Sequence, residues 1–68
     1  MSSKIKNVIN TIQNKTEISE HRGFKYKGVR LSRADAELII MQLKTFLARG
    51  DFFGSPTGGV KKVLDQII

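Results

Sequence analysis

The chain of 68 residues contains no cysteine, one histidine and six acidic residues. Without cysteine it forms no disulfide and no thiolate metal site, and His21 with scattered carboxylates does not supply the ligands of a structural zinc. A chain this short has a small core, so self-association is the remaining common source of stability. The sequence therefore predicts a single small domain over residues 1–68, a homodimer, and neither a metal nor a cofactor.

Long apolar runs are also missing. No stretch approaches the roughly 18 residues that cross a membrane. The N-terminal segment MSSKIKNVINTIQNK lacks the apolar core of about 7–15 residues that a secretory signal contains. We therefore expect a cytoplasmic protein with no membrane partner.

Acidic residues are in deficit, because 12 Lys and Arg residues against six Asp and Glu residues give a formal net charge of +6. This excess favours an acidic partner, either nucleic acid or an acidic protein surface. Catalytic constellations are assembled across a fold, whereas His21 has only its sequence neighbours Ser19 and Glu20. A chain this short also has little room to enclose a substrate pocket. The sequence predicts a binding protein and not an enzyme.

The apolar pattern predicts an α+β fold that is mostly α. The expected order is a helix, a short basic β ribbon or hairpin, a long central helix, a loop and a short C-terminal helix. Apolar residues from Ile5 to Ile12 at i, i+3, i+4 and i+7 predict the first helix, over residues 4–14. Residues 16–23 are polar and favour a connection, with a short strand around Ile18 as an option.

The central helix has the strongest signals. Ser32 with Asp35 resembles a capping box, and Gly50 stands where a C-terminal glycine cap belongs, so we expect a helix from about residue 33 to 49. Its apolar face is unusually wide and comprises Ala36, Leu38, Ile39, Ile40, Met41, Leu43, Phe46 and Leu47. A face of this width predicts either a dimer interface or a helix that is wrapped on all sides.

Residues 24–31 predict β structure whose alternation is interrupted. Phe24 and Tyr26 share one parity, whereas Val29 and Leu31 share the other. A bulge or a tight turn at residues 27–28 restores the phase. The pattern leaves open whether the ribbon is a local hairpin or half of an intermolecular strand pair.

Five cations and no acid occupy residues 21–33, and this is the strongest functional signal: Arg22, Lys25, Lys27, Arg30 and Arg33. On an extended segment, alternation places cations on one face and apolar bulk on the other. A row of cations suits a phosphate backbone. The alternative is a solvated edge strand on which lysine discourages pairing. Phe24 and Tyr26 either stack on bases or anchor the ribbon to the core.

Two other groups are candidates. The first is a phosphate-binding site at a helix start, formed by Thr57, Gly58, Gly59, Lys61 and Lys62. Its alternative is a flexible loop that leads into a basic helix face. The second is the pair Phe52 and Phe53, which serve either as anchors for a protein partner or as core residues.

From Gly23 onward the order of elements resembles that of the ribbon-helix-helix repressors. In that family, strands from two subunits pair and enter the major groove, so the resemblance implies a dimeric DNA-binding protein. The chain departs from the family in Gly28, in the long helix after Ser32, in the length of the DFFGSPT connection and in its additional first helix.

Our hypothesis is a small, basic, non-enzymatic regulatory protein that binds nucleic acid through residues 22–33. The alternative is a small inhibitor or accessory protein, of the kind that phages and mobile elements encode, which docks on an acidic surface of a larger host protein. Phe52 and Phe53 exposed beside the cations favour a protein partner. A continuous polar cationic face with buried aromatics favours nucleic acid.

Overall fold

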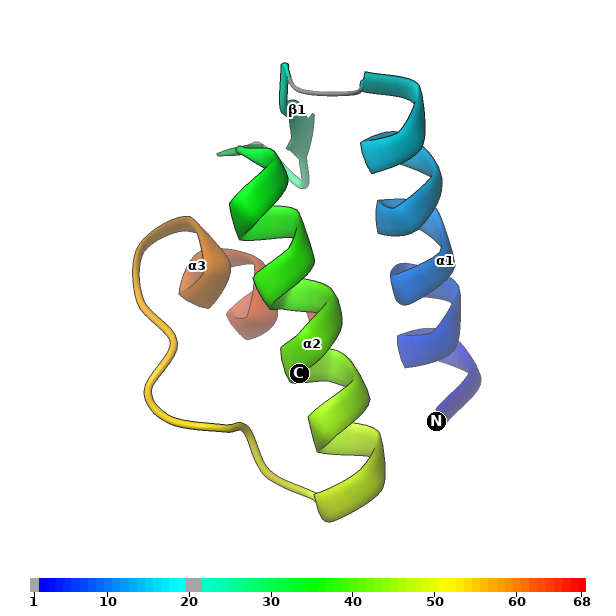
Figure 1. Ribbon diagram of the computed structural model, residues 1–68. Helices are drawn as coiled ribbons and strands as arrows, with labels where there is room; N and C mark the ends of the chain where they lie inside the picture. Colours follow the sequence, from blue (N-terminus) through cyan, green and yellow to red (C-terminus); the bar gives the residue numbers. More distant parts are fainter. Residues whose placement is uncertain (1, 20–21) are drawn as a thin grey trace.

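The computed structural model describes residues 2–19 and 22–68, so His21 lies outside the described residues. It confirms the mostly α architecture with an antiparallel hairpin. The elements follow in the order α1 (Ser2–Ser19), β1 (Phe24–Tyr26), β2 (Val29–Leu31), α2 (Arg33–Arg49) and α3 (Gly58–Ile67). α2 contacts both α1 and α3, and the hairpin lies at the end where α2 begins (Figure 1). None of the helices described has the length and apolar character that crossing a bilayer requires.

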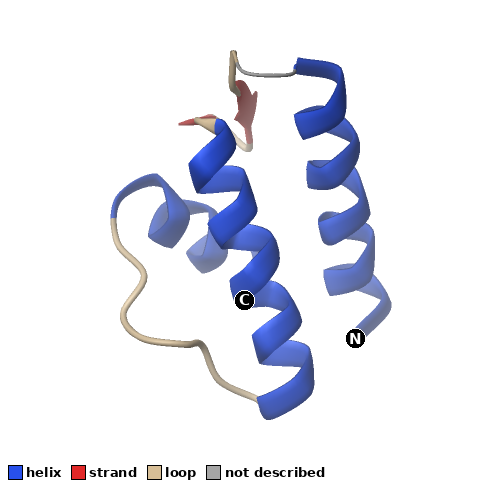
Figure 2. Ribbon diagram, in the orientation of Figure 1, coloured by secondary structure: helices blue, strands red, loops and turns tan. Residues whose placement is uncertain are grey.

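The core lies where the three helices and the hairpin meet (Figure 2). Ile12 of α1, Leu31 of β2 and Leu43 of α2 are fully buried. The other core residues are Val8, Ile9, Ala36, Ile39, Val60, Val63, Leu64 and Ile67. Leu31 therefore fixes the hairpin to the helices through burial of apolar surface.

The predicted bounds and caps of the central helix are confirmed. The Ser32 hydroxyl accepts a hydrogen bond from the Asp35 backbone N–H at 3.1 Å, and the Ser32 backbone N–H donates to the Asp35 carboxylate at 3.3 Å. At the other end Gly50 adopts the left-handed conformation, with φ 84°, and donates to the Phe46 carbonyl. These bonds satisfy backbone groups that a helix end leaves unpaired.

The first helix is longer than the sequence predicts, because α1 continues past Asn14 to Ser19. The strand option around Ile18 is wrong, since Ile18 lies in the helix and is 83% exposed. Apart from Ile18, residues 15–19 are polar, but they contain neither glycine nor proline, so nothing interrupts the hydrogen-bond ladder. The Thr16 hydroxyl also donates to the Ile12 carbonyl at 2.8 Å, which directs this polar side chain back onto the helix.

The ribbon is a local hairpin with a tight turn at Lys27 and Gly28. Both turn residues have positive φ, 51° and 80°, as a type I′ turn requires. The register pairs Phe24 with Leu31, Lys25 with Arg30, and Tyr26 with Val29. The turn therefore brings the apolar residues of both strands onto one face of the hairpin, as predicted. Because β1 and β2 pair within one chain, the arrangement differs from the ribbon-helix-helix family, in which each strand needs a second subunit.

Candidate functional site

The outer face of the hairpin brings two cations together. Lys25 of β1 and Arg30 of β2 are cross-strand partners, and both are exposed. Because side chains alternate along a strand, the neighbouring Phe24, Tyr26 and Leu31 lie on the opposite face, toward the core. The hairpin is therefore apolar on one face and cationic on the other.

The register also indicates how close the two cations are. Residues that flank a two-residue turn form a hydrogen-bonded pair, and pair types alternate along an antiparallel ladder. Lys25 and Arg30 therefore occupy a non-hydrogen-bonded pair, in which Cα atoms lie about 4.5 Å apart. Like charges directly opposite each other destabilise a sheet.

Two further exposed cations flank Lys25 along the chain, because Arg22 precedes β1 and Lys27 is the first residue of the turn. We define the cationic hairpin face as Arg22, Lys25, Lys27 and Arg30, all of them exposed. The Arg30 guanidinium donates to the Arg22 carbonyl at 3.3 Å, which joins β2 to the residues before β1. The Lys27 ammonium lies 5.6 Å from the centre of the Tyr26 ring. Gln66 of α3 donates to the Lys27 carbonyl at 3.2 Å and tethers the turn.

The acidic side chains that form ion pairs in the described residues do so away from the hairpin. The ion pairs there join Arg33 to Glu37 at 3.2 Å, Arg49 to Asp51 at 3.7 Å and Lys61 to Asp65 at 2.8 Å. Within residues 2–19 and 22–68, no carboxylate pairs with the cationic hairpin face. Arg33, which the sequence groups with the ribbon, begins α2 and has its own acidic partner.

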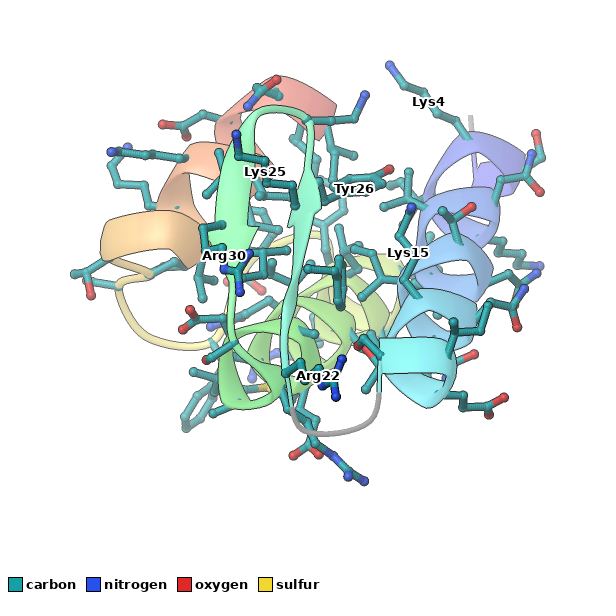
Figure 3. All side chains as sticks on the ribbon, turned by 90° about the horizontal axis from the view of Figure 1, so that it is seen from above. Lys4, Lys15, Arg22, Lys25, Tyr26 and Arg30 are labelled. Atoms are coloured by element: carbon teal, nitrogen blue, oxygen red, sulfur yellow. The ribbon has the colours of Figure 1, made fainter. Side chains whose placement is uncertain are left out.

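Lys15 is a cation that the sequence analysis did not assign to this surface. It is exposed on α1. In the view of Figure 3, Lys15 lies on the same side of the molecule as Lys25 and Arg30. α1 also contacts β1. No local signal could reveal this, because eight residues and a helix end separate Lys15 from β1.

The aromatic residues of the hairpin are anchors. Phe24 and Tyr26 are half-buried and pack against the core. Figure 3 shows the Tyr26 side chain directed toward α1. Burial raises the pKa of the Tyr26 hydroxyl above its ordinary value of 10.0. This arrangement favours the anchoring interpretation of both residues over base stacking.

The two adjacent phenylalanines after α2 have different environments. Phe52 packs against the core, with its ring centre 5.2 Å from that of Phe46. Phe53 is 64% exposed. One residue of the pair therefore closes the core, whereas the other is free to contact a partner.

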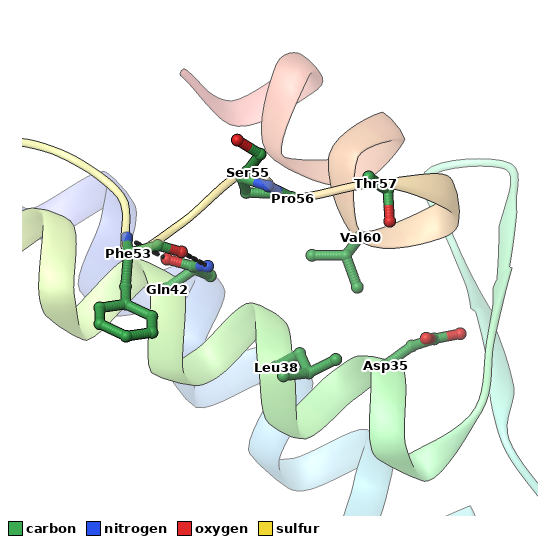
Figure 4. A pocket seen from close by; sticks show the side chains of 8 residues that line it. All are labelled: Asp35, Leu38, Gln42, Phe53, Ser55, Pro56, Thr57 and Val60. Atoms are coloured by element: carbon green, nitrogen blue, oxygen red, sulfur yellow. Dashed lines mark hydrogen bonds between the residues drawn. The ribbon is translucent and has the colours of Figure 1, made fainter.

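Gln42 holds Phe53 in place, and the sequence analysis did not identify it. The Gln42 side chain accepts a hydrogen bond from the Phe53 backbone N–H at 2.8 Å and donates to the Phe53 carbonyl at 2.5 Å (Figure 4). Only 6% of Gln42 is exposed. The available signal is a polar residue three positions after Ile39, on the buried stripe of α2.

The predicted phosphate-binding site lies at the start of α3. Thr57 is the N-cap but makes no side-chain capping bond, and Lys61 pairs with Asp65. A hollow of about 250 Å³ adjoins this helix start, lined by Asp35, Leu38, Gln42, Phe53, Ser55, Pro56, Thr57 and Val60 (Figure 4). The charged side chain in this lining is the carboxylate of Asp35, which repels a phosphate. The hairpin is therefore the stronger candidate for an anion.

The part of the chain that the structure describes holds no cluster of three or more metal-ligating side chains. Comparison of the chain with protein-family models, with curated proteins and with solved structures finds no match.

Proposed function

We propose that this protein is a small, non-enzymatic regulatory protein of the cytoplasm that binds nucleic acid through the cationic hairpin face. The observation that carries the proposal is the cross-strand pair of Lys25 and Arg30, two exposed cations on one face of a hairpin. A partner with closely spaced negative charges neutralises both side chains at once.

No carboxylate in the described residues forms an ion pair with this face. Opposed like charges weaken a strand pair, and the described carboxylates that form ion pairs lie on α2, α3 and the loop between them. A phosphate backbone, with its high density of negative charge, offsets this cost in a complex. The unfavourable pairing therefore supports a binding role.

The two-stranded shape of the hairpin makes duplex DNA the first partner to test. The major groove, about 12 Å wide, admits a two-stranded antiparallel ribbon. In this assignment Lys25 and Arg30 contact phosphates or base edges, while Arg22 and Lys27 contact the backbone on either side. Because the inner face of the hairpin rests on the core, only its outer face meets the nucleic acid.

The position of the aromatic residues favours nucleic acid over an acidic protein. Phe24 and Tyr26 lie beneath the cations, and exposed Phe53 belongs to the loop held by α2. The hairpin therefore presents a polar cationic face without an apolar anchor at its centre. Protein interfaces, in contrast, concentrate their binding energy in buried aromatic and arginine anchors.

A salt titration of binding tests this proposal. Duplex DNA, single-stranded DNA and structured RNA are titrated with the protein from about 50 to 200 mM salt, a range in which phosphate contacts weaken steeply. Replacement of Lys25, Lys27 and Arg30 by Ala should weaken binding and reduce the slope of log K against log salt by up to about 2.7 for duplex DNA, since each phosphate contact contributes about 0.9.

The matched control replaces Lys6, Lys61 and Lys62 by Ala, which removes the same charge from α1 and α3. We expect this control to retain most of the binding and most of the slope. A larger loss in the control would move the site to the start of α3. If the unmodified protein shows no salt-dependent binding to any of the three nucleic acids, the proposal is wrong, and an acidic protein surface becomes the partner to seek.

A further inference from the structure

One side of α2 is left uncovered by the rest of the chain. α1 and α3 each pack against α2, and a third stripe of the helix faces outward. This outer stripe of α2 consists of Ala34, Leu38, Met41, Thr45 and Ala48. It contains no charged residue, although Leu38 is 47% exposed and Met41 is 39% exposed.

The spacing of the outer stripe is that of a helix-pairing seam. Its members follow one another at intervals of four, three, four and three residues, which is the heptad spacing of two helices that pack side by side. Small residues stand at both ends and larger ones in the middle. The central layers can therefore interlock while the ends approach closely.

Phe53 enlarges this apolar surface at one edge. Its side chain and that of Leu38 line the same hollow, and Gln42 holds the Phe53 backbone there with two hydrogen bonds (Figure 4). An exposed aromatic residue fixed beside an uncharged helical stripe is typical of an interaction surface.

The charged residues beside the outer stripe indicate which partner packs against it. Glu37 and Lys44 stand seven residues apart on the same edge of the stripe, and both are exposed. Glu37 also pairs with Arg33 of its own helix through Oε1 at 3.2 Å, so its other carboxylate oxygen is the one that would meet Lys44 of a second copy. When two copies of α2 pack antiparallel, with Leu38 of each copy against Met41 of the other, Glu37 of each copy lies opposite Lys44 of the other. This geometry gives two pairs of opposite charges, one at each side of the centre.

A parallel arrangement lacks this complementarity. In a parallel pair of helices, a residue on one edge of the seam faces a residue of the second helix whose sequence number is five higher and which lies on the opposite edge. Lys44 would then face Arg49 of the second copy, and like charges at this position oppose pairing.

We propose that the outer stripe of α2 binds a second copy of this chain, so that two α2 helices pack antiparallel with Glu37 and Lys44 paired across the interface. In this arrangement the hairpins stand at opposite ends of the dimer, because each hairpin adjoins the start of its α2. Both cationic hairpin faces remain free, and dimerisation and nucleic-acid binding are separable. The seam is short, so the interface belongs to the small class and dissociates on dilution.

Sedimentation velocity over a concentration series tests the dimer. The unmodified protein should change from monomer to dimer as its concentration rises, because self-association follows mass action. Met41→Glu places a charge at the centre of the seam on an exposed position, and we expect it to stay monomeric while circular dichroism shows the same helix content. Lys62→Glu introduces a similar charge change on α3 and should leave dimerisation intact.

A charge reversal tests the orientation. Glu37→Lys should weaken the dimer at least tenfold, since each Lys44 then faces a lysine. The double variant Glu37→Lys with Lys44→Glu should restore dimerisation, because the two pairs are again opposite in charge. The proposal is overturned if the unmodified protein is monomeric at every concentration, or if the double variant is no better a dimer than Glu37→Lys.

The dimer and the nucleic-acid site can fail separately. Met41→Glu removes the dimer without touching the cationic hairpin face, and the triple alanine variant of that face leaves the outer stripe unchanged. Loss of dimerisation in the triple variant would contradict the placement of the interface on α2.

Discussion

The segments that lead into and out of α2 are held by different kinds of contact. The hairpin before α2 is built from neighbours in sequence, with three cross-strand pairs, a type I′ turn and a capping box at Ser32. The loop after α2 has no regular secondary structure, and its exposed Phe53 is held by Gln42, eleven residues earlier. The geometry of the cationic hairpin face therefore follows from local rules. The position of Phe53 depends on one side chain.

The largest expected effect comes from the base of the hairpin, at Gly23. Its φ is 76°, and a Cβ added there would overlap the Leu31 carbonyl. A side chain in the left-handed region costs roughly 1–2 kcal/mol, and the overlap adds roughly 1–3 kcal/mol. Gly23→Ala should therefore lower the free energy of unfolding by roughly 2–5 kcal/mol, measured by urea denaturation followed by circular dichroism.

Gly28→Ala is the matched control, because Gly28 has a similar φ of 80° but no atom within 4 Å of the added Cβ. It should cost only about 1 kcal/mol, the conformational strain alone. Equal losses in the two variants would mean that the close approach of residue 23 to Leu31 contributes nothing to stability.

The next largest effect concerns the loop. Gln42→Leu removes both side-chain bonds to Phe53 and leaves its backbone N–H and carbonyl unpaired. The expected loss is roughly 1–3 kcal/mol, and cleavage by a protease should become faster within residues 51–57, because the loop opens locally. Urea denaturation measures the loss of stability, and limited proteolysis with mass spectrometry locates the cleavage.

Gln66→Leu is the control for the loss of a glutamine. Gln66 is exposed, and its side chain donates to the Lys27 carbonyl at 3.2 Å. Because Gln66 is exposed, its replacement should lower the free energy of unfolding by no more than about 0.5 kcal/mol. If Gln42→Leu does not accelerate cleavage of the loop, then the rest of the loop positions Phe53 without Gln42.

The same contrast explains how much of the fold could be predicted. The bounds of α2, its caps and the turn at Lys27 depend on residues within a few positions of one another, and their sequence signals are specific. The end of α1 was predicted too early, because polarity after Asn14 resembles a connection although the helix continues. Polarity alone does not end this helix, since residues 15–19 contain neither glycine nor proline.

The candidate site was predictable to a similar degree. Alternation together with the predicted turn at residues 27–28 placed Lys25 and Arg30 on one face, but only the register places them opposite each other. Lys15 comes from another helix, and Gln42 acts on a loop eleven residues away. These contacts depend on how the elements pack, which hydrophobic periodicity does not specify.

The smallest expected change in stability bears most directly on function. Lys25→Glu converts the pair of like charges opposite Arg30 into a pair of opposite charges. A favourable cross-strand pair contributes roughly 0.2–1 kcal/mol, and the low end applies here because the pair is exposed. The protein should become slightly more stable to urea, while its binding to nucleic acid becomes weaker and less dependent on salt.

Lys62→Glu makes the same change of charge on α3, away from the hairpin. It therefore distinguishes the effect of the pair opposite Arg30 from the effect of the protein's net charge. It should leave binding to nucleic acid nearly intact and should not stabilise the hairpin. A Lys25→Glu variant that is less stable than the unmodified protein would show that the like-charged pair carries no folding cost. The pair would then give no support to a binding role for this face, because only a charge arrangement that the fold alone disfavours indicates such a role.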